Sequence, residues 1–182
     1  MSKKSSILIA VLMVAAGIAS RFMPHAWNMT PITAIALFSS VYLGIRYSLA
    51  IVFATMFISD IFIGFYDWRV MLSVYGGFAV AGLIGELVRR RKTIVNVILG
   101  AVSSSVFFFI ATNWAVWQFG SMYQHSAAGL LQDFALALPF FKNMLIGDIV
   151  YSGIIFGAFE LASVLSKKAV LVSSKSLSLE KA

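Results

Sequence analysis

The sequence predicts an all-α membrane protein: a bundle of six transmembrane helices with a short second helix and with both chain ends in the cytoplasm. Its 182 residues are 60% hydrophobic and only 12% charged, and the mean hydropathy is +0.93. A soluble domain is typically about 45–50% apolar and about 25% charged. Six apolar segments follow one another, and basic residues gather in alternate connections between them. A chain this apolar needs lipid as its solvent.

The six apolar segments lie at about 6–22, 31–45, 47–65, 70–88, 94–112 and 140–165. A helix needs about 20 residues to cross about 30 Å of hydrocarbon, and five of the segments approach that length. The second segment, with about 15 residues, covers only about 22 Å at about 1.5 Å per residue. We therefore expect the second helix to begin below the outer surface of the membrane.

The lysines and arginines predict which side of the membrane each connection faces, because positive charge gathers in cytoplasmic loops. With the N-terminus inside, eleven of the fourteen basic residues fall in the cytoplasm and three outside. The inner set comprises Lys3, Lys4, Arg46, Arg89, Arg90, Arg91, Lys92, Lys167, Lys168, Lys175 and Lys181. The outer set comprises Arg21, Arg69 and Lys142. The net charge of +7 is thus a topology signal, which argues against nucleic acid as a partner.

We interpret residues 1–168 as one domain and the polar residues 169–182 as a disordered cytoplasmic tail. Lys3 and Lys4 before an apolar run would also fit a cleaved signal peptide. Cleavage would put the following hairpins in conflict with the charge bias, so we expect the first segment to be retained. The chain has no cysteine, which excludes disulfides and thiolate metal sites.

The stretch RFMPHAWNMTPITA places polar side chains between the first two apolar segments. Thr30 is a good N-cap and Pro31 suits a first helical position, so the second helix is expected to start there. The residues before a short helix must descend into the membrane as irregular chain, which is tolerated only inside protein or beside a wet cavity. We expect His25, Trp27 and Asn28 to line a pocket open to the outside. An ordinary surface turn is the alternative.

A second long outer segment, 113–141, is too polar to span the membrane. Its residues 127–138 have the pattern of a short amphipathic helix, which we expect to lie in the outer interface and to cover the pocket. Trp114 and Trp117 would either stack on a ligand or belong to the aromatic belt of the membrane.

Two carboxylates, Asp60 and Asp148, fall in the outer halves of their segments. Charges at this depth usually face a bundle interior or a cavity and have a partner. Arg21 is the natural counter-ion, so the three are expected to form a structural ion-pair cluster. Direct contact of the two carboxylates with a ligand is the other interpretation, and both roles can coexist.

Known catalytic patterns are missing. The sequence has no G-x-x-x-x-G-K-[ST], H-E-x-x-H or G-x-S-x-G, and its two histidines are a hundred residues apart. We therefore expect no ATP hydrolysis by this chain, no enzymatic activity, no bound cofactor and no metal site. Small residues four apart, among them Ala81 with Gly85, predict close helix packing.

The segments PHAWNMTPITAIALFSSVYLG, FISDIFIGF and GLLQDFALALPFFKNMLIGDIVYSGIIFG together resemble a family of small bacterial six-helix membrane proteins of unknown function. That family is similar to the S components of ECF-type transporters, the substrate-binding membrane subunits for vitamins and trace-metal cofactors. The resemblance implies a multi-pass protein of the bacterial inner (cytoplasmic) membrane that binds a vitamin or other small cofactor for uptake. It also implies an ECF coupling subunit and ATPases as partners, with Ala15 and Ala19 as the docking pattern.

Together, the pattern and the resemblance predict a set of residues that contact the substrate. The set comprises His25, Trp27, Asn28, Asp60, Trp114, Trp117, Asn143 and Asp148. Two alternatives stay open: a structural or assembly protein of the membrane, or a membrane-embedded enzyme acting on a lipid headgroup through Asp60 and Asp148.

Overall fold

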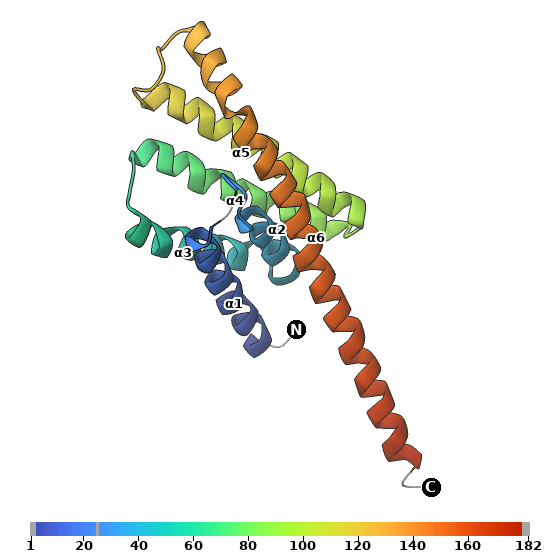
Figure 1. Ribbon diagram of the computed structural model, residues 1–182. Coiled ribbons are helices and arrows are strands. Elements are labelled where there is room, and N and C mark those ends of the chain that lie inside the picture. The colour runs from blue at the N-terminus through green and yellow to red at the C-terminus, as the bar shows by residue number, and fades with distance from the viewer. Residues whose placement is uncertain (1–2, 25, 180–182) are drawn as a thin grey trace.

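Six α-helices form the structure, a computed structural model that describes residues 3–24 and 26–179, with side chains described as far as Lys168. The helices are α1 (Lys3–Phe22), α2 (Ile32–Leu43), α3 (Ile45–Ile63), α4 (Trp68–Arg90), α5 (Ile94–Phe119) and α6 (Ala127–Leu179) (Figure 1). These ranges contain no strand. Five of the helices are long and apolar enough to cross a membrane, and α2 is the exception. The all-α prediction is confirmed, and the chain is a multi-pass membrane protein.

The short helix α2 forms the centre of the bundle. Every residue from Ile32 to Val41 is buried, and α2 contacts all five other helices. Its 12 residues correspond to about 18 Å at about 1.5 Å per residue, which is even shorter than the sequence predicts. A helix that is buried all round needs no polar face, because other helices surround it on every side.

Local chemistry explains the turn between α2 and α3 and the start of α4. Gly44 alone separates α2 from α3, with φ of 94°, a backbone conformation that favours glycine. Its N–H donates to the carbonyls of Ser39 and Ser40 and closes the end of α2. Asp67 caps α4 by accepting from the N–H groups of Arg69 and Val70.

The helices α2 and α4 cross with their backbones close together. A Cβ atom added at Gly85 would lie 2.8 Å from Cβ of Ser40 and 2.9 Å from the carbonyl oxygen of Leu37. Ala81, one turn earlier on α4, is also buried. The predicted close packing at this pair of small residues is therefore present, and α2 is the helix that approaches it.

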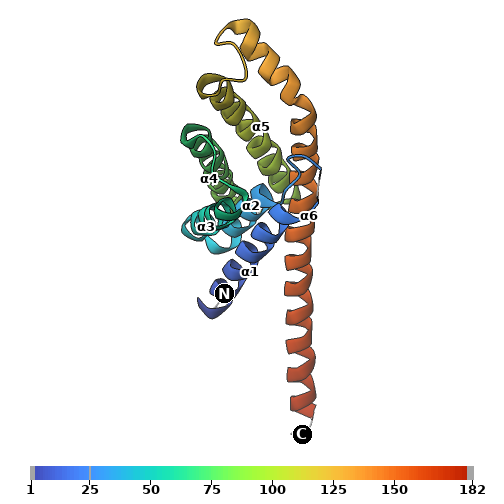
Figure 2. The ribbon, with the colours of Figure 1, turned by 60° about the vertical axis from the view of Figure 1, so that its left-hand side comes forward.

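The last helix differs from the prediction. Residues 127–138 are not a separate helix in the outer interface but the first part of α6. Figure 2 shows this part leaning over toward α5, whereas the rest of α6 runs straight. Pro139 lies inside α6 at the end of this part, and because proline lacks an N–H it bends a helix.

The far end of α6 also differs, because the helix reaches Leu179 where the sequence predicted a disordered tail over 169–182. Residues 158–179 contain neither glycine nor proline, so no residue in this range interrupts the helix.

We expect Gly85→Ala to destabilise the protein by about 1–3 kcal/mol, because the new methyl group forces α2 and α4 apart. Gly76→Ala is the matched control on the same helix, since no atom lies within 4 Å of its added Cβ. Thermal unfolding in detergent, followed by tryptophan fluorescence, measures both. Equal stability of the two variants would contradict the close crossing.

The charge pattern also predicts topology, and the absence of cysteine makes it easy to test. Arg91 and Ser121 lie beyond opposite ends of α5. In whole cells, an impermeant maleimide should label Ser121→Cys and leave Arg91→Cys unlabelled until the membrane is permeabilised. Labelling of Arg91→Cys from outside would reverse the predicted orientation.

Candidate functional site

A buried ion pair ties α1 to α3. Arg21 Nη1 lies 2.7 Å from Asp60 Oδ1, and the exposed fractions of the two side chains are 16% and 0%. The same guanidinium nitrogen donates to Ser59 Oγ at 2.6 Å. The Tyr75 hydroxyl of α4 donates to Asp60 Oδ2 at 2.8 Å. The carboxylate therefore holds three helices together, and its charge is matched within the protein.

Asp148 is not part of this ion pair, although the sequence predicted that it would be. It is buried, and its Oδ2 accepts a hydrogen bond from Ser105 Oγ of α5 at 2.6 Å. The Thr33 hydroxyl of α2 is a second hydrogen-bonding neighbour. The reason is the helix arrangement. Within the described residues, the backbone of α1 comes close to α2 and α3 but not to α6, so Asp148 on α6 has hydroxyl neighbours on α5 and α2 in place of Arg21.

A cavity of about 440 Å³ lies between these two polar groups, because Arg21 and Asp148 both line it. Its walls come from the segment before α2 and from all six helices. The lining residues are Arg21, Asn28, Thr30, Ile32, Thr33, Met56, Ile63, Tyr66, Val70, Val74, Phe78, Phe108, Phe109, Thr112, Asn113, Val116, Ala137, Phe140, Phe141, Met144 and Asp148. The walls are therefore mainly aromatic and aliphatic, with a few polar groups.

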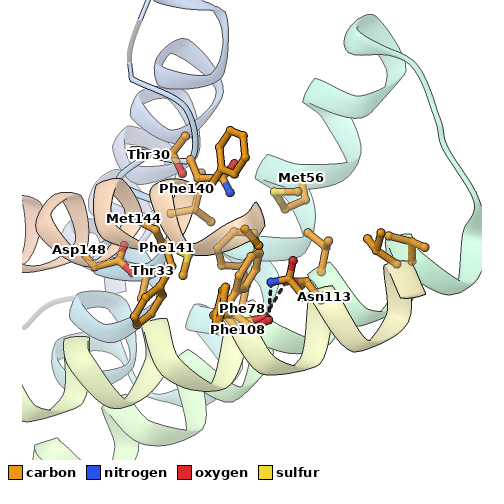
Figure 3. A pocket seen from close by; sticks show the side chains of 18 of the residues that line it. Thr30, Thr33, Met56, Phe78, Phe108, Asn113, Phe140, Phe141, Met144 and Asp148 are labelled. Atoms are coloured by element: carbon orange, nitrogen blue, oxygen red, sulfur yellow. Dashed lines mark hydrogen bonds between the residues drawn. The ribbon is translucent and has the colours of Figure 1, made fainter. Parts of the chain in front are cut away.

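The polar groups of the cavity lie at separate places in it. Figure 3 shows Asp148 and Thr33 together at one side of the cavity and Asn113 at the other, with Phe78 and Phe108 between them. The Asn113 amide donates to the carbonyl oxygen of Phe109 at 2.6 Å, which holds its side chain against α5. This arrangement suits a ligand with an apolar body and polar groups at its edges.

Tyr66, in the connection between α3 and α4, adds a hydroxyl to the lining. Desolvation of the phenol, followed by the nearby Asp60 carboxylate, raises the pKa of Tyr66 to about 12. At neutral pH Tyr66 is therefore an uncharged hydroxyl that both donates and accepts hydrogen bonds.

The structure places some predicted contact residues in the cavity wall. Asn28 and Asp148 line the cavity. Asp60 does not line it, but it forms an ion pair with Arg21, which does. Asn28 has φ of 60°, a left-handed conformation that asparagine tolerates better than most residues. Trp27 is 75% exposed and does not line the cavity. Its ring lies in a T-shaped arrangement with that of Phe140, a lining residue, at 6.0 Å between centroids.

Other predicted contact residues lie elsewhere. Trp114 and Trp117 are outside the cavity because α5 continues as a helix to Phe119 and turns both indoles away. Trp117 Nε1 donates to the carbonyl oxygen of Gln124 at 3.0 Å, and Trp114 packs against Phe119. Asn143 is half-buried on α6 and does not line the cavity. His25 falls outside the described residues.

Sequence reasoning missed the aromatic walls. On α6 the cavity face consists of Ala137, Phe140, Phe141, Met144 and Asp148, which recur at intervals of three and four residues. This spacing marks one face of a helix and excludes Asn143 from it. Counting back from Asp148 in steps of three and four residues leads to Met144 and then to Phe140 and Phe141.

Comparison with known proteins identifies the family of this chain. The family model described as Family of unknown function (DUF6580) matches residues 1–171. The chain belongs to this family. No curated protein and no solved structure is significantly similar to it. For this DUF6580 protein, the geometry of the cavity is therefore the main guide to function. Its described residues contain no group of three histidine, cysteine or acidic side chains that could hold a metal ion.

Replacing Asp60 by asparagine leaves Arg21 buried without its counter-charge, and we expect a loss of about 3–5 kcal/mol in unfolding free energy. Glu86→Gln is the control, because Glu86 pairs with Arg89 at 3.3 Å on an exposed surface. Such a pair contributes about 0–1 kcal/mol. Chemical unfolding in detergent compares the two. If Asp60→Asn cost no more than Glu86→Gln, the buried pair would not be a main support of the bundle.

Proposed function

We propose that this protein is a substrate-binding membrane protein, similar to an ECF S component, that takes up a vitamin or another small cofactor across the bacterial inner membrane. The observation that supports it best is the cavity of about 440 Å³ between Arg21 and Asp148. Binding sites for small molecules usually measure about 300–1,000 Å³ and combine apolar walls with a few fixed polar groups. Both properties are present here.

The proposed ligand lies between the phenylalanine rings and is oriented by the polar groups. Phe108 and Phe141 supply flat apolar surface in the middle of the cavity. Aromatic faces favour stacked or edge-on contact with another ring. Asp148 and Thr33 fix one edge of the ligand, while Asn113 meets the other. A flat ring with hydrogen-bonding substituents at both edges fits this distribution.

Transport in this proposal takes its energy from partner ATPases through an ECF coupling subunit. Ala15 and Ala19 support such docking because both are exposed on α1, whose only buried residue is Gly17. Small residues at a spacing of four let a partner helix approach closely in a membrane.

The first experiment identifies what the protein binds. Protein purified gently in mild detergent is denatured, and the released small molecules are analysed by mass spectrometry. We expect Ala137→Phe, which fills the cavity, to reduce the recovered molecule at least tenfold, equivalent to about 1.4 kcal/mol.

Ala135→Phe is the matched control, because Ala135 is exposed on the same helix and does not line the cavity. It should retain the molecule at the wild-type level. Equal recovery from both variants, with both folded, would move the ligand out of this cavity and remove the main support for the proposal.

A further inference from the structure

A second hollow, of about 430 Å³, lies between α4 and α5 near the turn that joins them. Figure 1 shows this turn, from the end of α4 to the start of α5. It is far along both helices from the ends that line the first cavity, and it shares no lining residue with it. Its lining residues are Ile84, Leu87, Val88, Arg90, Arg91, Asn96, Leu99, Gly100 and Ser103. The hollow therefore has an apolar body and a strongly basic end.

The two arginines at the basic end have no acidic partner in the part of the chain that the structure describes. Among the described residues, the ion pairs of this region join Arg89 to Glu86 and Lys92 to Glu160. Neither Arg90 nor Arg91 takes part in one, both side chains are exposed, and no carboxylate lines the hollow. Two positive charges therefore remain available to a ligand.

The start of α5 adds to this positive potential. The helix begins at Ile94, after Lys92 and the N-cap Thr93, and its N-terminus carries partial positive charge. The Asn96 amide donates to the carbonyl oxygen of Arg91 at 2.5 Å, which fixes the backbone of the turn beside the hollow. An anion at this point is attracted by the guanidinium groups and by the helix end together.

The apolar part of the hollow continues onto the lipid-facing surface. Leu87 of α4 is 61% exposed and Leu99 of α5 is 56% exposed, and both line the hollow. A small soluble anion would use the arginines but not the leucines, and a purely apolar molecule would do the reverse. A phospholipid with an anionic headgroup uses both, because its phosphate and its acyl chains are adjacent.

We propose that this hollow binds an anionic phospholipid, with the phosphate on Arg90 and Arg91 and an acyl chain along Leu99. Arginine forms paired hydrogen bonds to phosphate oxygens, which makes it well suited to this headgroup. Basic pockets between transmembrane helices on the cytoplasmic side favour such lipids, and the charge pattern predicts that this turn faces the cytoplasm. The bound lipid covers the junction of α4 and α5. This site does not depend on the function proposed for the first cavity.

Native mass spectrometry of the whole protein tests the proposal, with phosphatidylglycerol and phosphatidylcholine as probes. The wild type should bind phosphatidylglycerol at least tenfold more tightly than phosphatidylcholine. The double variant Arg90→Gln, Arg91→Gln should lose that preference. Lys167→Gln, Lys168→Gln is the matched control: it removes the same charge from the exposed surface of α6 and should keep the preference.

A third variant tests the apolar half of the site and needs no change of charge. Leu99→Gln is an exposed substitution and should weaken phosphatidylglycerol binding several-fold while leaving the melting temperature unchanged. If both charge variants lost the preference for phosphatidylglycerol equally, general electrostatic attraction would explain the lipid binding, and the proposal would be overturned. No lipid preference in the wild type, or full binding by Leu99→Gln, would overturn it as well.

Discussion

The complete burial of α2 is the constraint on which the rest of the structure depends. Because every residue from Ile32 to Val41 is covered, the other five helices have to pack around α2 on all sides. Close packing needs small residues at the crossings, and Gly85 of α4 supplies one where it meets the backbone of α2. Gly44 then reverses the chain in one residue, so that α3 returns alongside α2.

The short length of α2 also accounts for the cavity. At about 18 Å the helix is too short for its beginning and its end to reach both membrane surfaces. The segment before it is irregular, with Asn28 in a left-handed conformation and Pro31 directly ahead of the helix. Irregular backbone at this depth has to be enclosed by protein or to border a cavity. Here Thr30 and Thr33 line the cavity together with residues of the surrounding helices.

The features that depend on the hydropathy of one segment or on charge could be predicted from the sequence. The apolar segments, the shortness of α2 and the pairing of Arg21 with Asp60 follow from hydropathy and from the cost of an unpaired charge in the membrane. Features that depend on which helices are neighbours were not accessible. Asp148 meets hydroxyls because α6 lies beside α5 and α2, and hydropathy contains no information about that arrangement.

Helix ends were the other source of error. Residues 113–141 were predicted as an outer segment too polar to span the membrane, but α5 continues to Phe119, and its helical turns place Trp114 and Trp117 outside the cavity lining. Residues 127–138 were predicted as a separate helix in the outer interface, but they are the first part of α6 and lean toward α5. Phe140 and Phe141, which line the cavity, follow directly after this leaning part. The predicted start of the last segment, at about residue 140, instead falls inside the helix face that lines the cavity, which runs from Ala137 to Asp148.

Arg21 and Asp148, the two ionisable groups that line the cavity, have different partners, and this difference sets the polarity of the site. The charge of Arg21 is matched by Asp60 at 2.7 Å, so this side of the cavity contributes little net charge. Asp148 has hydroxyl neighbours in place of a cation within the described residues, and hydroxyls satisfy a carboxyl group less completely than a guanidinium does. The strongest unmatched polar group therefore lies at the α6 side of the cavity. Under the proposed function, a ligand gains most by placing hydrogen-bond donors there and its apolar body against the phenylalanines.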